Sequence, residues 1–261
     1  MKKKYDVVII GGGAAGMCCA AALKMQDRSI DVAVVEQLQR VGKKLIATGN
    51  GRCNITNKDE DISHFHSENN EFVRYALETY DNVYIENFFA DLGIVFTYDE
   101  IGRAYPYSLQ AASVVDALRF YLDKTDVGTL TEKKVVSLSK SDGIYELKTH
   151  DGDSIMGDAV LIASGLYSGG EKSGSNGSIF KILKSKGYKT VKITPAIVQL
   201  RTENAVTKSL KGIKVNAGTT LIINGQKVRS DYGEVLFRDY GLSGPPIMQI
   251  SRTVERDKMP K

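Results

Sequence analysis

The chain has 261 residues, with 35 Lys and Arg against 31 Asp and Glu, and a formal net charge of +4. It is 42% hydrophobic and 25% charged, an ordinary globular composition that excludes disulfide-scaffold, collagen-like and disordered classes. The length allows one large domain or two smaller ones. The basic residues are spread along the chain without an arginine-rich stripe, so we expect no nucleic-acid partner.

The cysteine content indicates a reducing compartment. Only Cys18, Cys19 and Cys53 occur, an odd number, and no Cys-x-x-Cys motif is present. The apolar run Val7–Ile10 is too short for a signal peptide. No stretch approaches the roughly 20 apolar residues that span a bilayer. We therefore expect a cytoplasmic protein that makes no membrane contact.

The first forty residues predict a strand, a glycine-rich turn, a helix and a second strand. Tyr5–Ile10 is apolar and rich in β-branched residues, as in a strand buried on both faces of a parallel sheet. The sequence Gly-Gly-Gly-Ala-Ala-Gly follows at 11–16, and Ala14–Met25 is typical of a helix. Asp31–Val35 is a second strand candidate, and it leads directly into Glu36. This order is that of a Rossmann βαβ unit.

Each residue of this motif has a physical role in binding a dinucleotide. Gly11 permits a tight turn, Gly13 lets a pyrophosphate approach the backbone, and Gly16 lets the helix pack against the sheet. The helix N-terminus offers unpaired N–H groups and partial positive charge to the phosphates. Glu36 can accept both hydroxyls of the adenosine ribose and would repel a 2′-phosphate, which disfavours NADP at this site. The alternative is a glycine-rich turn that only packs.

The segment between Glu36 and Asn57 shows no clear periodicity but is rich in groups that bind anions. Gly49 and Gly51 can expose consecutive backbone N–H groups in an anion-binding nest. Three cations accompany them: Lys43, Lys44 and Arg52. A loop of this length in a compact domain is uncommon unless it is functional, although a long turn with solvated basic residues is the alternative.

Several motifs resemble a family of bacterial flavoproteins that includes aminoacetone oxidase and flavin-dependent 3-dehydro-bile-acid reductases. The matching stretches are spread over nearly the whole chain: GGGAAG (11–16), VGKKLIATGNGRCNITN (41–57), GRAYPYSLQAASVVDAL (102–118), DAVLIASG (158–165) and GEVLFRDYGLSGPPIMQIS (233–251). The resemblance implies FAD as the cofactor. The chain has no second Gly-x-Gly-x-x-Gly motif, so we expect the electron partner to be oxygen, or NAD(P)H that reaches the flavin without a doubly wound domain of its own. Family members run well past the last of these motifs, so we expect this chain to be a fragment that holds FAD weakly.

The resemblance also implies which residues bind the cofactor. Those carried over to the ADP half and its surroundings are Gly11, Gly13, Ala14, Ala15, Gly16, Glu36 and Gln37. Those expected along the middle and the flavin edge are Lys44, Thr48, Gly49, Gly51, Arg52, Cys53 and Asn54. Val135 is expected to contact adenine, and the far side of the site is assigned to Ala163, Ser164 and Gly165. For Cys53 a redox role remains open beside that of a small residue that fits a close-packed backbone.

The middle of the chain predicts two helices with a loop between them. Asp81–Gly93 and Ser108–Lys124 have helical apolar spacing, and each begins with a candidate N-cap. The residues at 102–106 form the predicted loop. Its Arg103 and Tyr105 are weak candidates for contacting a substrate carboxylate or carbonyl. The alternative is a surface arginine and a packing tyrosine.

The remainder predicts an antiparallel meander followed by a second domain. Lys133–Lys140, Ile144–Thr149 and Ala159–Ala163 are strand candidates, and Ser175–Lys186 is a helix candidate. Past residue 190 we expect short strands at 197–201, 219–223, 226–230 and 234–237, and a helix capped by Ser243. The turn at Asn224-Gly225 is a type I′ hairpin signal. We predict a cofactor domain at 1–190, with a helical segment at 68–125, and an incomplete, β-rich inserted domain at 191–261.

These expectations combine into one fold and one function. The fold class is α/β, a doubly wound Rossmann-like domain with an antiparallel meander and part of a β-rich second domain. The function expected is hydride transfer through FAD to or from a small organic substrate. The alternatives are an NAD-dependent dehydrogenase and a non-catalytic nucleotide-binding module. We expect no metal, since nothing completes a ligand set around His64 and His66. The sequence does not predict an oligomeric state.

Overall fold

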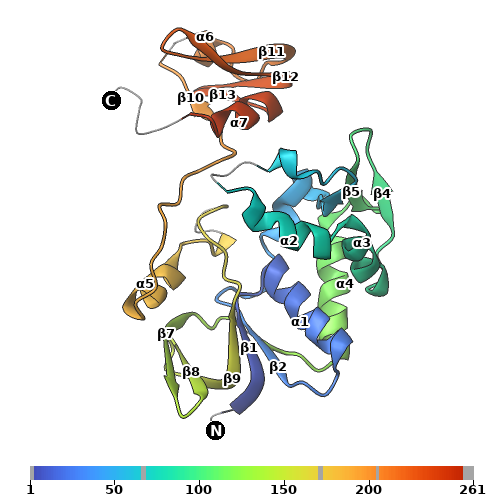
Figure 1. Cartoon of the computed structure of the whole chain (residues 1–261), viewed down its shortest axis with the longest axis vertical. Coiled ribbons are helices and arrows are strands. Elements are labelled where there is room, and N and C mark those ends of the chain that lie inside the picture. The colour runs from blue at the N-terminus through green and yellow to red at the C-terminus, as the bar shows by residue number, and fades with distance from the viewer. Residues whose placement is uncertain (1–2, 66–68, 170–172, 204–205, 255–261) are drawn as a thin grey trace. The chain divides into compact units, whose positions relative to one another are not determined.

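The computed structural model describes residues 3–65, 69–169, 173–203 and 206–254 (Figure 1). Contacts divide the chain into two compact units, Met1–Lys189 and Thr190–Lys261, which are described separately below. Within the described residues, no helix is long and apolar enough to cross a membrane.

A six-stranded sheet organises the first unit, in the order β6-β2-β1-β9-β8-β7. Its strands are β1 (Lys3–Ile10), β2 (Val32–Val35), β6 (Gly128–Leu130), β7 (Val135–Ser141), β8 (Ile144–Thr149) and β9 (Ser154–Ile162). β1 pairs in parallel with both β2 and β9, and β2 pairs in parallel with β6. β7, β8 and β9 form the antiparallel meander. The predicted doubly wound fold with a meander is confirmed.

Helices cover the two faces of this sheet (Figure 1). They are α1 (Ala14–Gln26), α4 (Ala111–Lys124) and α5 (Ser178–Ser185). Ile9 of β1 joins a buried cluster with Met17 of α1 and Leu118 of α4. Its neighbour Val8 joins a second buried cluster with Ile179 of α5. Successive side chains of a strand point to opposite faces, so the continuous apolar sequence of β1 serves two cores at once.

A smaller subdomain lies between β2 and β6 in the sequence. It contains η1 (Leu45–Gly51), β3 (Thr56–Asn57), η2 (Ile62–His64), α2 (Glu71–Thr79), α3 (Asn82–Asp91), β4 (Phe96–Tyr98) and β5 (Arg103–Pro106). β3, β5 and β4 form an antiparallel sheet. The predicted loop at 102–106 is therefore wrong, because pairing with β3 and β4 holds these residues as a strand. The segment 68–125 is helical only in part, since β4 and β5 interrupt it.

The helix caps agree with the sequence in one case and differ in another. Asp81 caps α3, because its Oδ1 accepts a hydrogen bond from the backbone N–H of Tyr84 at 2.8 Å. Ser108 does not cap α4, whose N-cap is Gln110. The Ser108 hydroxyl instead lies 2.7 Å from that of Ser113. Leu109 has a φ of +52°, which breaks the helical path that the spacing predicted to begin at Ser108.

The second unit is a four-stranded antiparallel sheet with two short helices. Its elements are β10 (Leu200–Arg201), α6 (Val206–Ser209), β11 (Lys214–Ile223), β12 (Gln226–Arg238), β13 (Gly241–Ser243) and α7 (Pro245–Ser251). Asn224 and Gly225 have φ values of +52° and +78°, as a type I′ turn requires. β12 is one continuous strand rather than the predicted two, and the N-cap of α7 is Gly244 rather than Ser243.

Candidate dinucleotide site

A pocket of about 440 Å³ opens where β1, β2 and β9 end and α1 begins. Its walls come from the glycine motif at 11–13, the segment after Glu36, the turn at 163–165 and residues 173–179. Ligands of open α/β sheets bind at the carboxyl ends of the strands, outside the sheet. The pocket therefore lies where the fold and the glycine motif both place a dinucleotide.

Each glycine of the motif is required for a different structural reason. Gly11 has a φ of +110°, and a Cβ there would lie 2.6 Å from the Ala163 carbonyl oxygen. A Cβ on Gly16 would lie 1.9 Å from the Gly11 carbonyl oxygen, so only glycine allows α1 to approach β1. A Cβ on Gly13 would meet nothing within 4 Å. The space in front of Gly13, at the N-terminus of α1, is thus open to a ligand.

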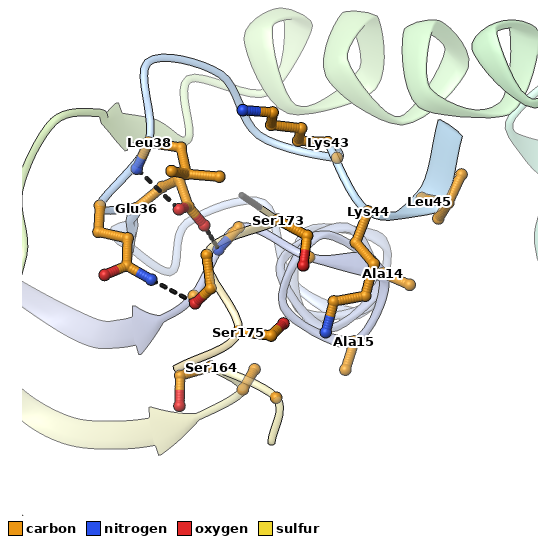
Figure 2. A pocket seen from close by; sticks show the side chains of 18 of the residues that line it. Ala14, Ala15, Glu36, Leu38, Lys43, Lys44, Leu45, Ser164, Ser173 and Ser175 are labelled. Carbon is orange, nitrogen blue, oxygen red and sulfur yellow. Dashed lines mark hydrogen bonds between the residues drawn. The ribbon is translucent and has the colours of Figure 1, made fainter. Parts of the chain in front are cut away.

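Glu36 is held at the end of β2 by its own backbone surroundings (Figure 2). The residue is only 8% exposed. One carboxylate oxygen accepts the backbone N–H of Gly12 at 2.8 Å, and the other accepts that of Leu38 at 2.9 Å. A carboxylate has about four acceptor positions, so lone pairs remain for ribose hydroxyls. The negative charge is therefore fixed in place, next to the glycine turn.

The side chains of Gln37 and Lys44 contribute to the pocket wall. The Gln37 side-chain amide donates to the Gly174 carbonyl at 2.5 Å, which ties the segment at 173–175 to the end of β2 (Figure 2). The Lys44 ammonium lies 3.3 Å from where a Cβ of Gly165 would be. In Figure 2, Lys44 points toward Ala15 at the start of α1. The pocket therefore combines a helix N-terminus with a lysine, a pair of features that attracts phosphate.

The segment at 48–54 forms a compact turn with left-handed backbone at four positions, Gly49, Asn50, Gly51 and Cys53. The backbone N–H of Arg52 donates to Gly49, and that of Cys53 donates to Thr48, at 3.2 and 3.0 Å. These two N–H groups close the turn itself. The Arg52 guanidinium lies over the Tyr105 ring, with 4.8 Å between its Cζ and the ring centroid.

Cys18 and Cys53 both line the pocket as neutral thiols. Burial raises the pKa of Cys18 from 9.0 to about 12, and the nearby thiols of Cys53 and Cys19 add to the rise. Burial also raises the pKa of Cys53, partly opposed by a hydrogen bond with Thr48. The thiolate is the reactive form of cysteine, so these surroundings favour two packing residues.

Most of the cofactor-binding residues predicted from sequence line this one pocket: Gly11, Gly13, Ala14, Ala15, Glu36, Gln37, Lys44, Thr48, Cys53, Asn54, Val135, Ala163, Ser164 and Gly165. Four predicted residues lie outside the lining, namely Gly16, Gly49, Gly51 and Arg52. That these residues bind a cofactor stays a prediction.

The candidate substrate residues also lie outside the pocket lining. The Arg103 Nε is 2.7 Å from Oδ2 of Asp99, and this partner lowers the pKa of the Asp99 carboxyl against the opposing effect of burial. Tyr105 is buried, with 3% of its surface exposed. These placements favour an ion-paired arginine and a packing tyrosine. A role toward substrate stays a prediction for both.

Several lining residues are absent from the sequence-based set. They include Leu38, Arg40, Lys43, Lys133, Lys134, Ser173, Ser175 and Ser178. A backbone hydrogen bond places Lys133 at the pocket: its N–H donates to the Glu36 carbonyl at 2.8 Å. Its ammonium pairs with Asp151 and Asp153, and these hydrogen bonds raise the pKa of Lys133 to about 12. The sequence signal available for this group is the pair of lysines at the start of the predicted strand 133–140, which directly precede the observed β7.

Of the two histidines considered as metal ligands, His64 and His66, the structure describes only His64. The His64 ring lies 2.8 Å from the Asp59 carboxylate, and His66 lies outside the described residues. Across the described part of the chain, no group of three or more His, Cys, Asp or Glu side chains is arranged to hold a metal ion.

The fold and the pocket define a protein of the Rossmann type, with a pocket at the carboxyl ends of the parallel strands. The chain belongs to the HI0933-like family, whose Rossmann-domain model matches residues 5–227. It is 36% identical to the 3-dehydro-bile acid Δ4,6-reductase of Clostridium scindens over 235 residues, which are 90% of this chain and 57% of that protein. It is 26% identical to the ribosomal RNA dihydrouridine synthase of Haemophilus influenzae over 241 residues, 88% of this chain and 58% of that protein.

The chain spans a little over half the length of these curated relatives. Among solved structures, the open conformation of a flavocytochrome c3 fumarate reductase superposes with a TM-score of 0.50 at 15% identity. That match covers 82% of this chain and 47% of the other. At this identity the likeness concerns the fold alone.

Proposed function

We propose that this chain forms the FAD-binding part of an oxidoreductase that transfers a hydride to or from a small organic substrate. The observation that carries the proposal is the pocket itself. It places a fixed carboxylate, Glu36, and a helix N-terminus with open space before Gly13 at one end of a parallel sheet. These are the two features that hold the ribose and the pyrophosphate of a dinucleotide.

The residues around the pocket fit FAD on further grounds. The Ser164 hydroxyl is buried and has no hydrogen-bond partner among the described residues, so a bound cofactor would supply one. Lys44 brings positive charge to the same space in which the helix N-terminus attracts phosphate. FAD, when bound, supplies an electron acceptor for hydride.

In this proposal the protein's own groups bind and orient. Glu36 accepts the ribose hydroxyls, the α1 N-terminus and Lys44 hold the pyrophosphate, and Thr48 and Asn54 border the redox-active end. The neutral thiols of Cys18 and Cys53 keep the wall small and uncharged. The similarity to a bile-acid reductase makes a conjugated ketone the first substrate class to test. Reduced nicotinamide dinucleotides and oxygen are the electron partners to compare.

Two other functions make different predictions. An NAD-dependent dehydrogenase would bind NAD⁺ in this pocket in place of FAD. A non-catalytic module would bind FAD but show no turnover with any acceptor. The similarity to a protein named ribosomal RNA dihydrouridine synthase makes a uridine-containing RNA the second substrate class to include, although the absence of a nucleic-acid partner stays our prediction.

The test is an FAD titration followed by turnover. Flavin fluorescence on adding the chain gives the dissociation constant, for the native protein and for Lys44→Gln and Glu36→Ala. The matched control is Lys148→Gln, because Lys148 is exposed on β8 and lies outside the pocket lining. We expect both pocket variants, but not the control, to weaken FAD binding. Equal binding by all four proteins would contradict the proposed site, and binding without turnover would favour the non-catalytic module.

A further inference from the structure

A second hollow of about 730 Å³ adjoins the candidate dinucleotide pocket. The segment after Glu36 lines both spaces, and α4 forms part of the wall of the second hollow through Val115, Asp116 and Arg119. Several residues border both spaces: Gln37, Leu38, Arg40, Lys43, Lys134 and Gly174. The two spaces are therefore neighbours at the end where Glu36 would hold a ribose.

The lining of this second hollow is basic. Four cations, Arg40, Lys43, Arg119 and Lys134, face two carboxylates, Asp116 and Glu132. Arg119 lies 3.5 Å from Asp116 and is thereby partly neutralised. The side chains of Arg40, Lys43 and Lys134 are exposed, and within the described residues these side chains make no hydrogen bond or ion pair. Three cations without partners around one hollow form a site for an anion with several charges.

Adjacent lysines divide between the two spaces. In Figure 2, Lys44 points toward Ala15 at the start of α1, whereas Lys43 extends in a different direction, away from Ala15. Lys44 lines the first pocket only, whereas Lys43 also lines the second hollow. The charge on Lys43 is therefore available to a ligand other than the one held by Lys44.

We propose that the second hollow binds the phosphates of a reduced nicotinamide dinucleotide, the electron donor of the reaction, and that its cations select NADPH over NADH. The inference rests on the proposed function. Glu36 repels a 2′-phosphate from the first pocket, so a phosphate-rich donor needs cations elsewhere. Ile46 also lines the hollow and lies two residues before Thr48 of the first pocket. A donor with its phosphates at Arg40 and Lys43 can extend along this segment toward the redox-active end.

The experiment is a calorimetric titration of the FAD-saturated chain with NADP⁺ and with NAD⁺ at low ionic strength. We expect NADP⁺ to bind about tenfold more tightly, because it carries one more phosphate. Arg40→Gln, Lys43→Gln and Lys134→Gln should each weaken NADP⁺ binding about two- to fivefold, as expected for exposed charge pairs. The matched control Lys148→Gln should bind as the native protein does. Melting temperatures verify that each variant is folded.

The outcomes separate this inference from the proposed function. Failure of FAD to bind in the preceding titration counts against the proposed function. With FAD bound, equal affinity for NADP⁺ and NAD⁺, or unchanged NADP⁺ binding in all three variants, overturns the present inference alone. Competition by inorganic pyrophosphate as strong as by NADP⁺ also overturns it, because the hollow would then be an unselective anion site. Arg119→Gln should leave FAD affinity unchanged, because Arg119 lines the second hollow and not the first pocket, whereas Lys44→Gln should lower it.

Discussion

The guanidinium of Arg52 stacks over the ring of Tyr105, with 4.8 Å between its Cζ and the ring centroid. The pair joins the turn at 48–54 to β5, although the two residues are far apart in the sequence. The amide of Asn54 reinforces the same junction, since it donates to the Ala104 carbonyl at 3.1 Å. Arg52 thus stabilises the segment that places Thr48 and Asn54 along the pocket, without lining the pocket itself.

This arrangement predicts a structural rather than a binding effect for Arg52. Arg52→Ala should lower the free energy of unfolding by ~0.5–1 kcal/mol, the contribution of an exposed cation–π pair. FAD affinity should fall less than in Lys44→Gln. Urea unfolding and flavin fluorescence measure the two quantities. A large loss of FAD affinity with unchanged stability would return Arg52 to the phosphate-binding role that its sequence suggests.

Two glycines of the same motif should respond oppositely to the same substitution. Gly16→Ala places a Cβ 1.9 Å from the Gly11 carbonyl, so α1 must move and unfolding should become easier by about 1–3 kcal/mol or more. Gly13→Ala adds a methyl group to open space, so the fold should be unaffected while phosphate approach and FAD affinity decrease. Thermal unfolding and FAD titration of both variants test this. Equal stability of the two would refute the close packing at Gly16.

Glu36 should be important for stability even when no ligand is present. In Glu36→Ala the backbone N–H groups of Gly12 and Leu38 lose their acceptors, which should cost about 1.5–3 kcal/mol as for hydrogen bonds to a charged group. Glu100→Ala is the control, since Glu100 is exposed between β4 and β5. Chemical unfolding without FAD provides the measurement. An unchanged midpoint for Glu36→Ala would show that the two hydrogen bonds contribute little.

Alkaline pH should destabilise the first unit through Cys18. Its pKa is about 12 in the folded protein against 9.0 when solvated, so the unfolded chain releases this proton first. The stabilisation is complete below pH 9 and is lost as pH rises from about 9 to 12, with a limiting slope of about 1.4 kcal/mol per pH unit. Cys18→Ala should have a shallower slope over that window. Identical slopes for the two proteins would contradict the burial argument.

The sequence determines the parts of this fold whose signals are local. The apolar strand at 5–10, the glycine motif and Glu36 predict the βαβ unit, because their spacing directly reflects sheet, turn and helix geometry. The Asn224-Gly225 hairpin is predicted for the same reason, since the required backbone angles favour these two residue types. In each case one short stretch contains both the pattern and its structural cause.

The features that escaped prediction depend on distant partners. Residues 103–106 become β5 only because β3 and β4 lie on either side, and no local pattern announces that pairing. The exclusion of Arg52 from the pocket follows from the position of Tyr105, and the hollow bounded by Lys43 and Lys134 follows from the docking of α4. Such features come from tertiary packing, which sequence periodicity does not encode.

Because the side chains of Lys43 and Lys44 diverge (Figure 2), the length of the loop that carries them matters for function. Gly42 and Leu45 on either side are buried, and the Gly42 N–H donates to the Gly12 carbonyl at 2.7 Å. The backbone between Gly42 and Leu45 is therefore held at both ends. Insertion or deletion of a single residue there should displace both ammonium groups from the spaces that they line. Tolerance to such changes should therefore be far lower here than at the exposed Asp142-Gly143 turn, even though both segments lie at the protein surface.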